Sequence, residues 1–261
     1  MTSRIVTRRD GDIATVVLSH SGKLNALTVA MWQALAAAMH ELSAAEDVRC
    51  VVLRGEDDKA FAAGADIAEF ATVRNTREQG EIYHRRYVYG ALRAVADCRH
   101  PTVAMIHGPC VGGGLEIACQ CDIRIAGESA RFGVPINRLG FPIAYDELEA
   151  VLPVIGRAAA LEMLLEGRVW EAREAYDKGL VARVVPDAKL EDEAYATARR
   201  IADGAPLVAR WHKQMIRRLA PHVPPLTEAE RSDNFQYFDT EDYRIGYEAF
   251  MAKRKPRFTG R

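Results

Sequence analysis

The sequence predicts an α/β core followed by a C-terminal helical subdomain. Apolar, strand-like runs alternate with helix-like segments over the first two-thirds of the 261-residue chain. Beyond about residue 190 the composition becomes charged and helical in pattern. Apolar residues make up 49 % of the chain, which is enough for a full hydrophobic core and excludes a disordered chain. We therefore expect a core over residues 1–190 and a helical subdomain over residues 191–261.

The first part of the core is predicted to be a strand, a helix and a second strand. Residues 13–18, with the sequence I-A-T-V-V-L, are typical of a buried strand. Thr28 then opens a helix that runs to about Ala45. Large apolar residues recur in this helix at helical spacing, at Trp32, Leu35, Met39 and Leu42. Residues 50–53 are predicted to form the second strand.

The rest of the core continues the alternation. A long helix is predicted over 77–98, followed by a strand over 103–106. The glycine-rich loop 108–114 then leads into a short helix over 115–119, and residues 122–126 form the next strand. Helical segments are predicted in the C-terminal part over 189–203, 206–219, 227–238 and 241–254.

Charge and apolar patterning exclude two classes of partner. The 35 basic and 36 acidic residues give a formal charge of −1, so we expect no nucleic-acid binding. Apolar runs are broken well before about 18 residues, the length that a membrane span requires. The N-terminal residues lack a targeting pattern. We therefore expect a cytoplasmic protein without membrane contact.

The cysteines are expected to be reduced thiols in the core. Their number is odd, they form no C-x-x-C pair, and they lie among Val, Ile, Ala and Gly. Three of them are close in sequence with His107 nearby, so a metal cluster is the alternative, but metal ligands normally have paired spacings. We expect no metal site, and for His107 a hydrogen-bonded structural role rather than a place in the site. The cysteines are Cys50, Cys98, Cys110, Cys119 and Cys121.

The glycine-rich loop 108–114 is the first candidate for chemistry. It lacks both a following Gly-Lys-Ser/Thr and the G-x-G-x-x-G spacing, so it does not resemble a phosphate-binding loop. Glycines let a backbone approach a ligand closely, and a helix N-terminus offers free N–H donors and a partial positive charge. This combination suits a developing oxyanion, with Glu116 nearby to transfer a proton. The alternative is a tight turn with a solvated Glu116.

A second loop favours the chemical interpretation. Residues 61–66, F-A-A-G-A-D, follow a strand and again end at a helix N-terminus, where Asp66 and Glu69 have the spacing of a capping box. Two small-residue loops can direct backbone N–H groups at one carbonyl oxygen from both sides. Such an oxyanion hole contributes typically ~10²–10³-fold to the rate per donor.

The two stretches F-A-A-G-A-D-I and H-G-P-C-V-G-G-G-L-E-I-A-C-Q-C-D-I-R-I-A resemble the signatures of the crotonase (enoyl-CoA hydratase/isomerase) superfamily. Residues 23–27 and 132–135 resemble further loops of that family, and residues 245–258 its C-terminal helix, so the resemblance covers nearly the whole chain. It implies a ββα-spiral core and an acyl-CoA thioester ligand, with no cofactor beyond the coenzyme A of the substrate. It also implies a homotrimer or a dimer of trimers, with the C-terminal subdomain as lid and trimer contact.

Carried over residue by residue, the resemblance assigns specific roles. Ala65 and Gly113 match the N–H donors of the oxyanion hole, and Glu116 matches a catalytic glutamate. Contacts to the acyl-CoA are implied at Leu24, Ala63, Asp66, Ile67, Gly112, Pro135, Ile136, Leu139 and Lys253.

This sequence departs from the family pattern at one catalytic position. A second glutamate should follow Pro135, where this chain has Ile136. Isoleucine cannot move a proton, and a drier pocket should raise the pKa of Glu116. Asp146 and Glu147 reach the pocket only if their helix faces it, and we expect instead that they begin a surface helix.

The resemblance implies an enoyl-CoA hydratase, a lyase that adds water to a 2-enoyl-CoA. The thioester carbonyl would lie between the N–H groups of Ala65 and Gly113, and Glu116 would transfer the proton. A single carboxylate also suffices for an enoyl-CoA double-bond isomerase, which is the first alternative. A non-catalytic, CoA-binding oligomeric protein is the second.

Overall fold

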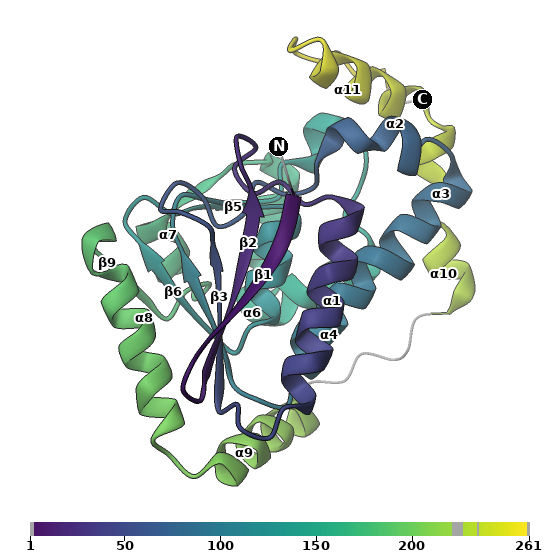
Figure 1. The fold of residues 1–261 in the computed structure, drawn as a ribbon. Coiled ribbons are helices and arrows are strands. Elements are labelled where there is room, and N and C mark those ends of the chain that lie inside the picture. The colour runs from purple at the N-terminus through teal and green to yellow at the C-terminus, as the bar shows by residue number, and fades with distance from the viewer. Residues whose placement is uncertain (1–2, 221–226, 234, 260–261) are drawn as a thin grey trace.

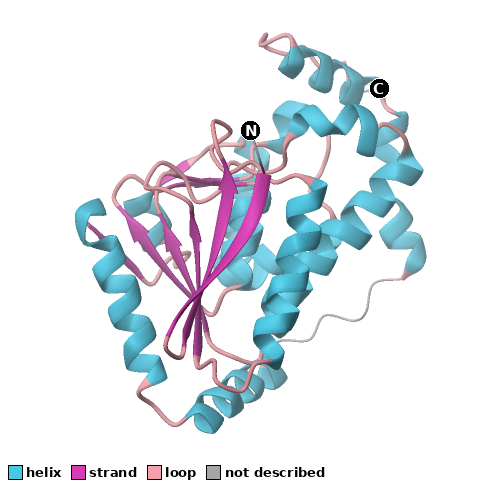
Figure 2. Cartoon of the chain, in the orientation of Figure 1, coloured by secondary structure: helices cyan, strands magenta, loops and turns pink. Residues whose placement is uncertain are grey.

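The computed structural model describes residues 3–220, 227–233 and 235–259. Within them, a six-stranded sheet forms the centre and helices cover both of its faces (Figure 1, Figure 2). The first two strands pair antiparallel, and every other neighbouring pair in this sheet is parallel. The spatial order is β1 (Ser3–Asp10), β2 (Ile13–His20), β3 (Cys50–Gly55), β4 (Thr102–Ile106), β6 (Ile123–Gly127) and β9 (Arg183–Val185). The predicted α/β class is confirmed.

The edge strand β1 is not among the strands predicted from the sequence. Its residues, S-R-I-V-T-R-R-D, are mostly polar and none is buried. β1 pairs with β2 along its full length, from Ser3 opposite His20 to Asp10 opposite Ile13. Its strand conformation therefore depends on this pairing rather than on an apolar pattern of its own.

The two faces of the sheet bury separate apolar clusters. Alternate residues of a strand point to opposite faces, so Val51 and Val52 of β3 belong to different clusters. The Val51 side is covered by two helices and the Val52 side by one. The covering helices are α1 (Val29–Ala44) and α4 (Tyr89–Asp97) on the first side and α8 (Asp187–Ala202) on the second. Parallel strands buried on both faces explain the continuous apolar runs of the sequence.

A second, small sheet positions the glycine-rich loop. It has three strands in the order β5 (Pro109–Val111), β7 (Arg131–Gly133) and β8 (Trp170–Glu171). The chain passes from β4 through β5 directly into helix α5 (Gly113–Gln120), which begins two residues earlier than predicted. Gly112 precedes this helix with a φ of +51°, in the region that favours glycine.

The start of α1 agrees with its sequence signal. The Thr28 side chain accepts a hydrogen bond of 3.2 Å from the N–H of Met31, so threonine caps the first turn as predicted. The helix ends at Ala44, and the predicted end at about Ala45 is confirmed within one residue. Its apolar residues Trp32, Leu35 and Met39 are fully buried.

The predicted helix over 77–98 has a wider central turn. It consists of α3 (Arg77–Ile82), a π-helical turn η2 (Tyr83–Val88) and then α4. Such π turns occur often at functional sites, because they redirect side chains on one face of a helix. Here Tyr83 and His84 are buried by this turn.

The C-terminal third is helical, as predicted, but one expected helix is shorter. The segment expected as a helix over 227–238 instead contains a short α-helix and a separate 3₁₀ turn, and the aromatic residues Phe235 and Tyr237 beside that turn are buried. Burial of these rings favours a turn over a continuous helix. After β6 and β7, the remaining helical elements are η3 (Ile136–Leu139), α6 (Tyr145–Glu166), α7 (Ala172–Asp177), α9 (Pro206–Leu219), α10 (Glu228–Asp233), η4 (Gln236–Asp239) and α11 (Glu241–Met251).

The predicted boundary at residue 190 falls inside α8. This helix packs on β3, β4 and β6, so it contributes to the core of the sheet. The division into domains 1–190 and 191–261 therefore stays a prediction. In the described part of the chain, no helix combines the length and the apolar character that a membrane crossing needs.

Candidate active site

A cavity of about 880 Å³ lies where the two small-residue loops meet the end of α11 and the chain that follows it. One wall comes from the segment that follows β3, with the helix-like turns η1 (Ile67–Glu69) and α2 (Phe70–Val73). A second wall comes from the N-terminus of α5, and a third from the segment 135–141. The chain after α11 closes the remaining side with residues 254–256 and 258.

Backbone hydrogen bonds hold the two small-residue loops side by side. The N–H of Val111 donates to the carbonyl of Ala62 at 3.0 Å, which places the 61–66 loop along β5. The N–H of Ala63 donates to Leu24 at 3.0 Å on the other side of the loop. The predicted convergence of the two loops is thus present in the fold.

The backbone of Ala65 leaves one N–H group free. The two neighbours of Ala65 in the chain both form hydrogen bonds with Leu27. The N–H of Leu27 donates to the carbonyl of Gly64, and the N–H of Asp66 donates to the carbonyl of Leu27. In such a parallel bridge the N–H of Ala65 itself faces away from Leu27. Within the described residues it donates to no protein group, and Ala65 lines the cavity.

Gly113 offers a second free donor. It is the first residue of α5, so its N–H has no partner inside the helix, and it lines the same cavity. A Cβ atom at this position would lie 2.7 Å from the ring of Trp32, so the helix start packs directly on α1. The geometry thus suits the predicted pair of donors at Ala65 and Gly113, and their role in an oxyanion hole stays a prediction.

We expect Gly114→Ala to destabilise the protein and to lower its activity. A Cβ atom there would lie 2.4 Å from the backbone oxygen of Ala62, so the two loops would have to separate. The expected cost is about 1–3 kcal/mol in the free energy of unfolding, measured by urea denaturation.

Gly90→Ala is the matched control for this variant. It lies inside α4 with no atom within 4 Å of the added methyl group, so it should be neutral or stabilising by roughly 0.5–1 kcal/mol. If Gly114→Ala is as stable as Gly90→Ala, the two loops do not depend on their close contact.

Asp66 caps the turn that follows the first loop, but the capping box is only half formed. Its side chain accepts a hydrogen bond of 3.2 Å from the N–H of Ala68. The carboxylate of Glu69 does not return to Asp66, and it accepts instead from the N–H of Val29 at the start of α1, at 2.8 Å. The sequence spacing predicted that Asp66 and Glu69 would cap each other, and this was wrong for Glu69. The reason is that the N–H of Val29, in a different helix, lies close enough to donate to Glu69 instead.

Most of the residues assigned by resemblance line the cavity, and three do not. Leu24 is exposed, Asp66 forms an ion pair of 3.6 Å with Lys23, and Lys253 is exposed; none of the three lines the cavity. Their predicted contacts to coenzyme A remain untested. The residues that do line it are Ala63, Ala65, Ile67, Gly112, Gly113, Glu116, Pro135, Ile136 and Leu139.

Glu116 is buried in the wall of the cavity, with 4 % of its surface exposed. Burial raises the pKa of its carboxyl group well above the ordinary value, and the negative charge of Glu147 raises it further. The direction of this shift agrees with the expectation from the sequence. The interpretation of Glu116 as a solvated surface residue is wrong, because α5 is packed under the loop and inside the core.

Glu147 is a second buried carboxylate in the same cavity. The expectation that Asp146 and Glu147 begin a surface helix was wrong: both are buried, and Glu147 lines the cavity. The cause is that α6 packs against α5, which turns its first turn inward. Asp146 does not line the cavity and forms an ion pair with Arg231 instead.

His84 holds the carboxylate of Glu147. Its Nδ1 forms a hydrogen bond with Oε1 of Glu147, and the N–H of Ala144 donates to Oε2 at 3.4 Å. Burial alone would raise the pKa of Glu147, but its interaction with His84, followed by the field of Arg74, lowers it below the ordinary value, while burial lowers the pKa of His84 itself. Glu147 is therefore the more acidic of the two carboxyl groups of the cavity.

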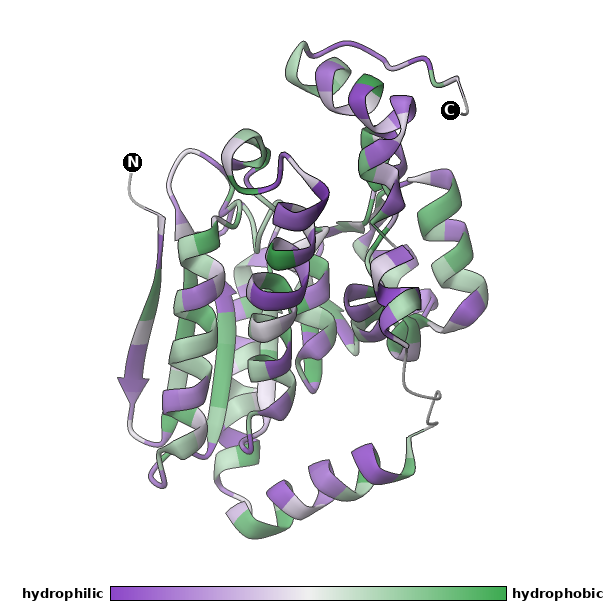
Figure 3. Cartoon of the chain, turned by 90° about the vertical axis from the view of Figure 1, so that its right-hand side faces the viewer, coloured by the Kyte–Doolittle hydropathy of each residue, from purple (hydrophilic) through white to green (hydrophobic). Residues whose placement is uncertain are grey.

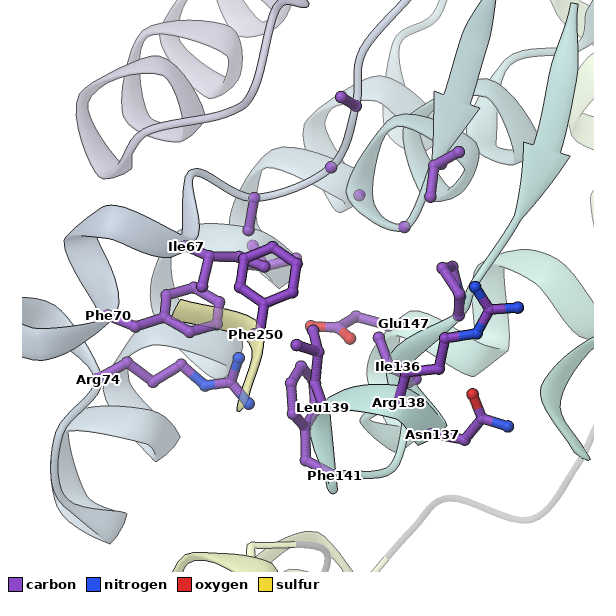
Figure 4. A pocket seen from close by; sticks show the side chains of 18 of the residues that line it. Ile67, Phe70, Arg74, Ile136, Asn137, Arg138, Leu139, Phe141, Glu147 and Phe250 are labelled. Atoms are coloured by element: carbon purple, nitrogen blue, oxygen red, sulfur yellow. The ribbon is translucent and has the colours of Figure 1, made fainter. Parts of the chain in front are cut away.

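Sequence reasoning missed two residues of this site, His84 and Arg74. Both come from the segment 67–88, where polar residues within a helical pattern are normally assigned to the surface. Both are buried and line the cavity. Figure 4 shows Arg74 and Glu147 reaching toward the same space from different elements. The π turn that contains His84 leaves no signal in the amino-acid pattern.

The cysteines and His107 lie outside this cavity. All five cysteines are free and buried, as expected for core thiols, and burial raises the pKa of Cys50 to about 12. His107 is buried, and its Nε2 lies 3.4 Å from the carbonyl oxygen of Asp187. Its expected hydrogen-bonded role agrees with this contact.

Comparison with known proteins identifies the fold and the family. The sequence pattern of the enoyl-CoA hydratase/isomerase family matches residues 8–261. The chain belongs to the enoyl-CoA hydratase/isomerase family. The predicted crotonase resemblance is thereby confirmed, and with it an acyl-CoA thioester as the ligand class of the family.

Relatives within the enoyl-CoA hydratase/isomerase family match over nearly their whole length. A protein of Mycobacterium tuberculosis named probable enoyl-CoA hydratase is 36 % identical over 98 % of each chain. A crystal structure described as an enoyl-CoA hydratase/carnithine racemase from Magnetospirillum magneticum is 50 % identical, with a TM-score of 0.82 over 98 % of this chain and 96 % of that one. A methylmalonyl-CoA decarboxylase complexed with 2S-carboxypropyl CoA superposes with a TM-score of 0.88 at 26 % identity, over 98 % of each chain.

Proposed function

We propose that this protein is an enoyl-CoA hydratase that works with Glu116 and Glu147 as its pair of carboxylates. The observation that carries the proposal is that both are buried in one cavity, where His84 and the N–H of Ala144 form hydrogen bonds with Glu147. The pKa of Glu116 is raised and that of Glu147 lowered, in keeping with this arrangement. Two carboxyl groups whose environments separate their pKa values can act as the acid and the base of one reaction. The relatives named as enoyl-CoA hydratases support the same reaction.

In the proposed reaction, the thioester carbonyl lies between the N–H groups of Ala65 and Gly113. The ionised Glu147 takes a proton from water as the water oxygen bonds to C3 of the enoyl group. The electron pair of the double bond moves toward the carbonyl, where the two N–H donors stabilise the enolate. The protonated Glu116 then delivers a proton to C2. Glu147 thus takes the part that the family pattern assigns to the position of Ile136.

The basic residues after α11 are suited to the phosphates of coenzyme A. Arg254 and Lys255 line the cavity, whereas the predicted contact Lys253 does not. Cationic side chains form strong charge-assisted hydrogen bonds with phosphate oxygens. We infer that coenzyme A enters as part of the substrate along this side, and that no further cofactor takes part.

Hydration of crotonyl-CoA tests the proposal directly, followed as loss of the enoyl absorbance. We expect turnover by the wild-type chain. Isomerisation of a 3-enoyl-CoA without hydration would favour the double-bond isomerase. Binding of acyl-CoA without either reaction would favour the non-catalytic alternative.

We infer that the chain forms homo-oligomers through α9. This helix carries a row of exposed apolar residues on one side, seen among the green positions of α9 at the bottom of Figure 3. An exposed apolar face of this kind normally marks an interface. The residues are Leu207, Val208, Trp211, Met215, Ile216 and Leu219. A trimer or a dimer of trimers, and a cytoplasmic location, remain predictions from the sequence.

Trp211→Glu is expected to shift the protein toward monomers, because it places a charge in the apolar face of α9. Light scattering coupled to gel filtration measures the mass directly. Lys189→Glu on the exposed side of α8 is the control and should leave the mass unchanged. A wild-type chain that is already monomeric at high concentration would refute the interface.

A further inference from the structure

Arg74 is a buried cation in the cavity wall that the proposed hydration does not use. Only 1 % of its surface is exposed, and it lies directly after α2. Its Nη2 donates a hydrogen bond to the hydroxyl group of Tyr237. Its buried Nε has no partner within the described residues. The buried guanidinium group of Arg74 therefore has an N–H donor, at Nε, that forms no hydrogen bond within the described residues.

The surroundings of Arg74 are aromatic rather than acidic. Its guanidinium carbon lies 4.5 Å from the ring centre of Phe70 and 4.1 Å from that of Phe141. Across the described residues, no carboxylate oxygen lies within 4.0 Å of its nitrogen atoms. Aromatic faces offset part of the cost of burying a cation, but they supply no counter-ion.

Arg74 influences the pKa of Glu147, but the carboxylate of Glu147 forms its hydrogen bonds with other groups. Its two carboxylate oxygens are taken by His84 and by the N–H of Ala144. In Figure 4 the guanidinium of Arg74 lies between Phe70 and Phe141, in the wall of the cavity that Arg74 lines. The cavity wall therefore contains a buried cation that has no ion-pair partner within 4.0 Å among the described residues.

We propose that Arg74 binds a carboxylate at the far end of the acyl chain, so that the substrates are 2-enoyl-CoA thioesters that carry a second, terminal acid group. A guanidinium matches a carboxylate in shape and charge, and the apolar rings around it fit the intervening methylene groups. This proposal takes one element from the proposed function, namely that the ligand is an acyl-CoA thioester. The rival explanation is that Arg74 only ties α2 to η4 through Tyr237.

Binding of saturated acyl-CoA thioesters tests the proposal without any turnover. The probes are malonyl-, succinyl-, glutaryl- and adipyl-CoA, each compared with its methyl ester, which has nearly the same shape but no charge. Isothermal titration with the full chain gives the ratio of the two dissociation constants for each length. We expect at least one acid to bind roughly 10- to 100-fold tighter than its ester, a range typical of a buried charge pair.

Arg74→Gln should remove this preference, and Arg74→Lys should retain part of it. Arg77→Gln is the matched control: Arg77 bonds Ser232 in the same C-terminal segment but does not line the cavity, so the ratio should not change. Equal binding of acid and ester by the wild-type chain at every length would overturn the proposal. So would a ratio that is unchanged in a folded Arg74→Gln variant.

The binding test for the carboxylate site and the hydration test for the proposed function can fail independently of each other. A protein that prefers the acids but hydrates no enoyl-CoA would retain the carboxylate site and lose the hydratase assignment. A protein that hydrates crotonyl-CoA and ignores the terminal acid would do the reverse.

Discussion

Replacing Glu116 by Gln lowers the hydration rate by ~10²–10⁴-fold, the range typical of a lost general acid or base. Gln keeps the shape of the side chain and removes the proton that C2 needs, so the dissociation constant of a saturated acyl-CoA should change little. Steady-state hydration of crotonyl-CoA and titration with butyryl-CoA measure the two effects. A folded variant that keeps more than a tenth of the activity would remove Glu116 from the proton transfer.

The same substitution should stabilise the protein above acidic pH. The pKa of Glu116 is raised in the folded state, so the native protein keeps the proton that the unfolded chain releases. Its contribution to stability is fully present below the ordinary carboxyl pKa and declines as the pH rises toward the raised value. Thermal unfolding at several pH values should therefore show a smaller loss of stability with rising pH in Glu116→Gln than in the wild type.

Replacing Glu147 by Gln removes hydration but spares proton exchange at C2. The variant loses the base that takes the proton from water, so we expect a fall in hydration of ~10²–10⁴-fold. Removal of the Glu147 charge takes away one of the two causes that raise the pKa of Glu116, so the ionised form of Glu116, with the loop N–H groups, can exchange a C2 proton of a saturated acyl-CoA with deuterium from the solvent. Mass spectrometry measures that exchange, which should be absent in Glu116→Gln.

Two further variants make this result specific. Asp146→Asn is the matched control, because Asp146 is equally buried in the same helix but pairs with Arg231 outside the cavity. Its hydration rate should stay near that of the wild type. In the Glu147→Gln background, Ile136→Glu restores a carboxylate where the family pattern has one, and it should recover part of the activity. Loss of C2 exchange together with hydration in Glu147→Gln would show that Glu147 has no separate role in activating water.

The proposed pH profile follows from the same two groups. Hydration needs Glu147 ionised and Glu116 protonated. The pKa of the first is lowered and that of the second raised, so activity should fall in acid through the first and in alkali through the second. Ordinary carboxyl groups in water would give a much narrower window of activity, since their pKa values nearly coincide.

The sequence by itself determined the features that adjacent residues encode. The capped helix after Thr28 and the loop 61–66 are contiguous patterns, and so is the glycine-rich entry to α5 with Glu116 in its first turn. Each depends on local propensity, on glycine at positive φ, or on the position of one side chain within a helix turn. Recognition of the family also rested on these stretches.

Only the tertiary structure decided how the rest of the cavity is built. Glu147 and Asp146 are adjacent acids at a helix start, and packing of α6 on α5 buries both but directs only Glu147 into the cavity. His84 reaches Glu147 because a π turn places it there, and Arg74 lies among rings contributed by distant segments. Burial is set by which helix packs on which, over contacts far apart in the chain, so a local pattern of polar residues cannot distinguish a buried charge from a solvated one.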